Sequence, residues 1–154
     1  MWAASQRIYD PAHPEARVAQ LLGGKVAFNI NTPGNRAWKN TCAVRMSYML
    51  NAAGVYIPYL KGKTVSGADK RWYFHYVKDV ITFLRQRWGE PDLVAAYPNG
   101  TELVGKRGVI LFEVNGWNDA AGHASLWNGT QCYDHCYFNA PGASYTTNRA
   151  NFWV

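Results

Sequence analysis

The spacing of apolar residues changes along the chain, and this change constrains the fold more than any other feature of the sequence. Between residues 14 and 88 apolar residues recur at helical intervals, whereas from Leu103 onward they form short runs typical of strands. These runs cover 109–114, 124–128 and 131–138, and an Asn128-Gly129 turn separates the last two. Helices followed by antiparallel strands predict an α+β fold with the helices packed on an antiparallel sheet.

Three helices are expected before these strands. The first spans Pro14 to Leu22, with proline in its first turn and glycine after its end, and the second spans Cys42 to Ala53. The third opens near Asp69 and ends at Gly89. The segment 56–67 contains one proline and two glycines, so we expect a loop there that can cover a site.

Length and charge narrow the class of protein. The 154 residues contain no repeat or linker, so 1–154 is expected to be a single domain. An excess of 16 Lys and Arg over 10 Asp and Glu favours anionic partners, but the basic residues form no stripe interleaved with aromatics, so nucleic acid is not expected. No apolar run reaches the roughly 18 residues of a membrane span, and residues 1–10 lack the pattern of a secretion signal.

Cys42 stands directly after Asn40 and Thr41, at the expected start of the second helix. Backbone N–H groups and the helix dipole at that end favour a thiolate, which is the nucleophilic form of cysteine. The same N–H groups, beginning with that of Cys42, can hold the oxygen of a tetrahedral intermediate, with the Asn40 side chain as a second donor. The alternative is a small buried thiol without chemistry.

A base for this thiol is available in His123, which stands after Gly122 at the entrance to an expected strand. The other three histidines have simpler explanations in a surface segment, a helix and a loop. A hairpin through Asn128-Gly129 would bring Asp134 beside His123, where a carboxylate can orient the imidazole. The alternatives are a half-buried strand histidine bonded to backbone and an ion-paired surface aspartate.

Cys132 and Cys136 are separated by three residues and allow two interpretations. In an oxidising compartment they can close a small disulfide loop, which leaves Cys42 as the one thiol. Alternatively, they can bind zinc together with His135 and His123 in an interaction module, although no second cysteine pair is present. A non-catalytic wall-binding domain is a further alternative, because 15% aromatic residues and positive charge suit stacking on sugars.

The order of these residues resembles that of the papain-like cell-wall peptidases of the NlpC type, in which cysteine, histidine and acid follow one another along the chain. More narrowly, the chain resembles the fourth family of type VI secretion system amidase effectors over roughly residues 31 to 138. The segments that carry this resemblance agree in order and spacing; they are Asn40 to Ser47 with Leu50, Asn51 and Gly54, then Gly108 to Phe112, Gly122 to Gly129, and Cys132 to Phe138.

The resemblance implies a single catalytic domain that hydrolyses the γ-D-glutamyl to meso-diaminopimelate bond of peptidoglycan stem peptides, without a metal or organic cofactor. It implies that Cys42 is the nucleophile, His123 the base and Asp134 the orienting acid, and that Cys132 and Cys136 form a disulfide. It also implies an antibacterial toxin that the type VI secretion apparatus, rather than a signal peptide, carries into a rival's periplasm, and a cognate immunity protein that blocks the site.

Overall fold

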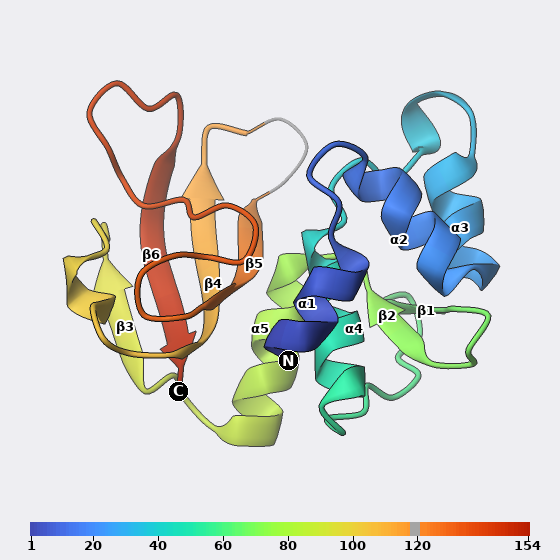
Figure 1. Cartoon of the computed structure of the whole chain (residues 1–154), viewed down its shortest axis with the longest axis horizontal. Helices are drawn as coiled ribbons and strands as arrows, with labels where there is room; N and C mark the ends of the chain where they lie inside the picture. Colours follow the sequence, from blue (N-terminus) through green and yellow to red (C-terminus); the bar gives the residue numbers. More distant parts are fainter. Residues whose placement is uncertain (118–120) are drawn as a thin grey trace. The chain divides into compact units, whose positions relative to one another are not determined.

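The first half of the chain, residues 1–76, is one of two units into which the computed structural model divides, and it is mainly helical (Figure 1). The structure describes residues 1–117 and 121–154. The unit's elements in order are the helices α1 (Trp2–Ile8), α2 (Pro14–Leu22) and α3 (Gly24–Asn31), a 3-10 turn η1 (Gly34–Arg36), helix α4 (Cys42–Ala52) and an antiparallel pair of strands, β1 (Thr64–Ser66) and β2 (Trp72–Phe74).

Helix α4 is the buried centre of this unit, and polar side chains attach it to β2 and to the loop that follows it. Ser47 Oγ accepts the Phe74 N–H at 2.9 Å, and Asn51 Nδ2 donates to the Trp72 carbonyl at 3.0 Å. The Asn51 carbonyl oxygen also accepts the Ile57 N–H at 3.1 Å. An apolar cluster surrounds these contacts and contains Ile8, Val18, Leu22, Val26, Val44 and Tyr73.

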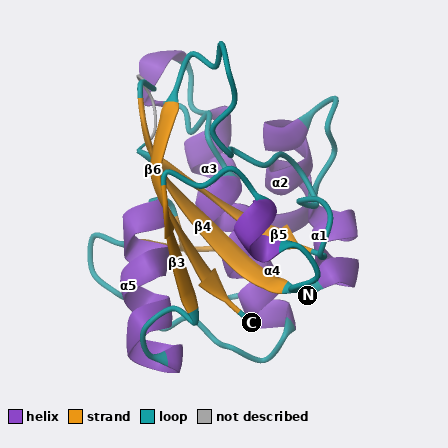
Figure 2. Ribbon diagram, turned by 90° about the vertical axis from the view of Figure 1, so that its left-hand side faces the viewer, coloured by secondary structure: helices purple, strands orange, loops and turns teal. Residues whose placement is uncertain are grey.

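The second unit, residues 77–154, holds a four-stranded antiparallel sheet and one long helix (Figure 2). The strand order is β3-β6-β4-β5. Helix α5 packs against β5, and Trp153 Nε1 donates to the Gly89 carbonyl just beyond the end of α5, at 3.1 Å. The elements are α5 (Val77–Trp88), β3 (Leu93–Ala96), a 3-10 turn η2 (Thr101–Leu103), β4 (Gly108–Asn115), β5 (Gly122–Trp127) and β6 (Thr146–Trp153).

One face of this sheet is covered by the loop between β5 and β6. Phe112 packs edge-on against both Tyr137 and Phe138 of that loop, and Trp127 packs edge-on against Phe138. The apolar cluster beneath the loop contains Leu103, Ile110, Val114, Ala150 and Phe152 in addition. Because side chains alternate along a strand, His123, Ser125 and Trp127 of β5 share one face. His123 therefore lies on the side that the loop covers.

Several expectations from the sequence are confirmed and others are wrong. The helix at 14–22, the helix from Cys42 and the strands around 109–114 and 124–127 are present. The third helix begins at Val77 rather than near Asp69, because residues 72–74 pair with β1 as a strand. Among the described residues no helix has the length and apolar character to cross a bilayer.

The expected strand at 131–138 is also wrong, because beyond one isolated bridge between Trp127 and Cys132 the segment is a loop. The Cys132 and Cys136 Cα atoms are 5.4 Å apart. Residues four apart in an extended strand are separated by roughly 13 Å, so a disulfide across this spacing excludes a strand. The expected single domain 1–154 stays a prediction, since the chain divides into two units.

Candidate active-site residues

Strand β5 positions His123, and Gly122 before it is required by a close approach of backbone. A Cβ atom at Gly122 would lie 2.5 Å from the Phe112 carbonyl oxygen and 3.1 Å from a Val77 methyl carbon. His123 pairs with Phe112 of β4 in the ladder and is 5% exposed. Only glycine lets β5 pack this closely between β4 and the start of α5. Packing therefore explains why a glycine stands directly before His123.

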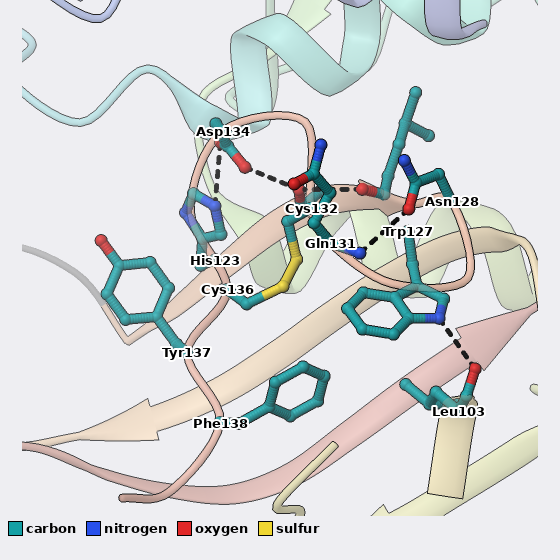
Figure 3. Close-up of a disulfide and its surroundings, with 12 residues drawn as sticks. Leu103, His123, Trp127, Asn128, Gln131, Cys132, Asp134, Cys136, Tyr137 and Phe138 are labelled. Carbon is teal, nitrogen blue, oxygen red and sulfur yellow. Dashed lines mark hydrogen bonds and ion pairs between the residues drawn. A yellow bond between two sulfur atoms is a disulfide. The ribbon is translucent and has the colours of Figure 1, made fainter. Parts of the chain in front are cut away.

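His123 and Asp134 form a buried pair in the second unit (Figure 3). The distance from His123 Nε2 to Asp134 Oδ2 is 3.0 Å, and the two side chains are 7% and 1% exposed. The expected meeting of these residues after the Asn128-Gly129 turn is therefore present. Nε2 is the imidazole nitrogen that faces the carboxylate, so a proton exchanged with another group would be carried on Nδ1.

Ser125 completes the surroundings of the Asp134 carboxylate. Its hydroxyl donates to Asp134 Oδ1 at 2.6 Å, and Ser125 is fully buried. Each carboxylate oxygen thus has its own partner, which fixes the plane in which the carboxylate meets the imidazole. No role for Ser125 is predicted from the sequence, where its only signal is its place two residues after His123 on the same strand face.

The Tyr137 ring and a disulfide hold the pair in place. Tyr137 packs edge-on against the His123 imidazole, with ring centroids 4.8 Å apart. The Cys132–Cys136 disulfide closes the loop that carries Asp134, and the Tyr133 N–H donates to the Leu126 carbonyl of β5 at 3.1 Å. The zinc-binding alternative required both thiolates, so the disulfide removes it. Within residues 1–117 and 121–154, no three or more His, Cys, Asp or Glu side chains are grouped so that they could hold a metal ion.

Cys42 lies in the first unit, at the first residue of α4, and is 1% exposed. With Cys132 and Cys136 bonded to each other, Cys42 is the cysteine that keeps a thiol. Thr41 precedes the helix, and its hydroxyl accepts a hydrogen bond from Arg45 Nη1 at 2.8 Å. The expected position of the thiol at a helix start is confirmed.

The tentative oxyanion hole of Asn40 and the Cys42 backbone stays a prediction. The Cys42 N–H donates to Asn40 Oδ1 at 3.2 Å. Asparagine side chains often accept the N–H two residues later in the chain in this way. The carboxamide oxygen accepts this bond, so the donor that Asn40 could offer to an oxyanion is its Nδ2 group. The bond also orients the residue that carries the thiol.

Residues 38–153 match the family described as type VI secretion system (T6SS), amidase effector protein 4. The chain belongs to this family. Among curated proteins, none matches the chain. The match covers most of the chain and includes all three cysteines and the His123–Asp134 pair.

Solved structures of this effector family agree over nearly the whole chain. Tae4 of the type VI effector–immunity complex Tae4–Tai4 from Enterobacter cloacae is 39% identical, with a TM-score of 0.87 over 99% of this chain and 93% of that chain. Tae4 in the corresponding Salmonella Typhimurium complex is 34% identical, with a TM-score of 0.86 over 99% and 94%. The expected α+β fold of papain-like, NlpC type is confirmed, as is the resemblance to type VI amidase effectors.

Proposed function

We propose that this amidase effector is a cysteine DL-endopeptidase that hydrolyses the γ-D-glutamyl to meso-diaminopimelate bond of peptidoglycan stem peptides. In this proposal Cys42 is the nucleophile, His123 the base and Asp134 the residue that orients the base. The observation that carries it is the buried His123–Asp134 pair at 3.0 Å, because a catalytic imidazole needs one fixed tautomer and one fixed plane. The position of Cys42 at the start of α4 adds support.

The reaction follows from the chemistry of these groups. His123 Nδ1 takes the proton of the Cys42 thiol, and the sulfur attacks the γ-carbonyl carbon of D-glutamate. When the tetrahedral intermediate collapses, the C–N bond breaks and His123 returns the proton to the leaving amino group of meso-diaminopimelate. A water molecule, deprotonated by the same nitrogen, then cleaves the thioester, which releases the carboxylate and restores the thiol.

We further propose that both units of the chain, 1–76 and 77–154, make one catalytic domain, since Cys42 belongs to the first unit and His123 and Asp134 to the second. The reaction as written needs all three residues. No cofactor enters any step.

The biological setting is inferred from the family. Solved Tae4 relatives are described as type VI effector–immunity complexes with Tai4, which supports a cognate immunity protein for this chain. We infer an antibacterial toxin that the type VI secretion apparatus delivers into the periplasm of a rival cell, where peptidoglycan lies. The net charge of +6 favours this carboxylate-rich polymer.

Digestion of purified meso-diaminopimelate peptidoglycan tests the proposal. The wild-type protein should release fragments whose masses place a new carboxylate on D-glutamate and a new amino group on meso-diaminopimelate. Cys42→Ala should abolish release, and His123→Ala should reduce it at least a thousandfold. His13→Ala is the matched control. Because His13 is exposed, this variant should cleave peptidoglycan as the wild-type protein does. Undiminished cleavage by Cys42→Ala would refute the assignment, and a different cut would redirect the substrate.

A further inference from the structure

A group of aromatic and basic side chains lies on the surface of the first unit, around the β1–β2 hairpin. Tyr56 and Tyr59 are 54% and 58% exposed, so a large part of each ring faces solvent. The Arg71 guanidinium lies over the Tyr56 ring, 4.2 Å from its centroid. The Tyr59 ring packs against that of Trp72 with 4.9 Å between centroids. These contacts join the loop before β1 to strand β2 in one continuous surface.

The backbone beneath these rings is held by hydrogen bonds. The Leu60 N–H donates to Thr64 Oγ1 at 2.8 Å, and the Leu60 carbonyl accepts the N–H groups of Lys63 and Thr64. On the other side of Tyr59, Ile57 is buried and its N–H donates to Asn51 of α4. Because the rings are presented on an ordered support, a ligand that stacks on them pays little conformational entropy.

The charge of this surface is positive. Lys61, Lys63, Lys70 and Arg71 are exposed, and within residues 55–76 the one acidic residue is Asp69. The Asp69 carboxylate accepts bonds from the Tyr73 hydroxyl and the Arg71 N–H. Asp69 is thereby occupied within the turn, and the cations remain available to an anionic ligand.

We propose that Tyr56, Tyr59, Lys61, Lys63, Arg71 and Trp72 form a binding surface for the glycan strand of peptidoglycan, separate from the reacting residues. Sugar rings would stack on the tyrosine faces, and carboxylates of the polymer would pair with the cations. The identity of the polymer rests on the proposed function. The surface would hold the enzyme on its insoluble substrate between successive cuts.

The composition of the surface favours such a polymer over a protein partner. Tyrosine and arginine occur at both kinds of interface, but lysine is depleted where proteins meet. Here two lysines accompany two tyrosines, and none of the six proposed residues is aliphatic. A ligand that offers both sugar rings and carboxylates matches this combination.

Sedimentation with purified peptidoglycan sacculi tests the proposal, in a Cys42→Ala background so that the substrate stays intact. Tyr59→Ala combined with Arg71→Gln should weaken binding about tenfold, since one stacking contact and one cation are removed. Phe28→Ala combined with Lys25→Gln is the matched control, because Phe28 is 63% exposed with a cation 4.6 Å from its ring on α3. The control should bind like the parent.

A second variant and a second substrate make the result decisive. Lys61→Gln with Lys63→Gln, at two exposed positions, should reduce binding and its dependence on salt. On a soluble stem peptide without sugars, Tyr59→Ala/Arg71→Gln with an intact Cys42 should retain wild-type kcat/KM, while cleavage of sacculi falls.

The proposal would be overturned if Tyr59→Ala/Arg71→Gln bound sacculi as tightly as the Phe28→Ala/Lys25→Gln control. Loss of immunity-protein binding with unchanged sacculus binding would also overturn it and assign the surface to a protein partner. If wild type leaves the stem peptide intact while Tyr59→Ala/Arg71→Gln still loses sacculus binding, the proposed function fails and the binding surface stands.

Discussion

Ser125→Ala tests whether the Asp134 carboxylate is held as the structure describes. The substitution removes a 2.6 Å hydrogen bond to Asp134 Oδ1 in a place where Ser125 is fully buried and the Asp134 side chain is 1% exposed. A hydrogen bond to a charged group contributes about 1.5–3 kcal/mol. We therefore expect the free energy of unfolding to fall by about 2 kcal/mol, measured by urea denaturation. In this size range that corresponds to a fall in Tm of roughly 4–8 °C.

Ser5→Ala provides a matched comparison. Ser5 is also fully buried and donates at 2.6 Å, but its acceptor is the neutral Trp2 carbonyl one turn earlier in α1. Loss of a neutral bond costs about 1 kcal/mol, and alanine recovers part of this through its helix propensity. The difference between the two variants therefore combines the charge of the acceptor with the helix propensity gained at residue 5.

The catalytic effect of Ser125→Ala should be smaller than that of His123→Ala. His123 keeps its contact with Asp134 Oδ2, but the carboxylate loses one of the two bonds that fix its plane. Misorientation of a catalytic group by a fraction of an ångström to 1 Å costs up to about a hundredfold, so kcat/KM on a stem peptide should fall tenfold to a hundredfold. An unfolding free energy equal to that of Ser5→Ala, with unchanged kcat/KM, would refute the argument.

Three further changes are predicted. Gly122→Ala should destabilise the protein by about 2 kcal/mol in urea denaturation and lower activity, because the new methyl group meets the Phe112 carbonyl at 2.5 Å; wild-type stability would contradict this. Replacing both Cys132 and Cys136 by serine should cost about 2 kcal/mol for so short a loop and make activity insensitive to reductant, whereas wild-type activity should fall under reductant. Burial lowers the pKa of His75 below its ordinary 6.5, so the unfolded state binds a proton more readily and stability should decline as the pH falls below about 6.5. His75→Phe, which keeps a ring against Trp38, should flatten that part of the plot of urea midpoint against pH. An unchanged slope in His75→Phe would contradict this prediction.

The elements that could be predicted from the sequence are those that local residues determine. Pro14 and Gly23 bound α2, and the helix has the expected ends. The aromatic residues 72–76 suit a helix stripe or a strand equally well, and the choice is made by distant residues, because Ser47 and Asn51 of α4 bond the backbone of β2. Strand β6 was missed for a related reason, since its partners β3 and β4 lie far from it in the sequence.

In the candidate site, too, the features that could be predicted are those that nearby residues determine. His123 and Asp134 are eleven residues apart across one turn, so a hairpin argument could place them together. Ser125 could not be assigned, because a serine within a strand has no pattern that distinguishes a carboxylate partner from ordinary packing. The bond from the Cys42 N–H to Asn40 was missed because asparagine before a helix can act as donor or acceptor, and the sequence does not specify which.

The predicted contact between Asp134 and His123 forms, but a loop rather than the expected strand brings Asp134 there. The bridge between Trp127 and Cys132, and the bond from Tyr133 to Leu126, start an antiparallel register in which Asp134 lies opposite Ser125. If pairing continued in that register, residue 136 would come opposite His123 and the carboxylate would stay with Ser125 alone. The disulfide instead draws Cys136 back to within 5.4 Å of Cys132 between Cα atoms, which ends the backbone pairing after Tyr133. Asp134 can then keep Ser125 on one oxygen and meet His123 with the other, so the failure of the expected strand is the reason that the expected pair forms.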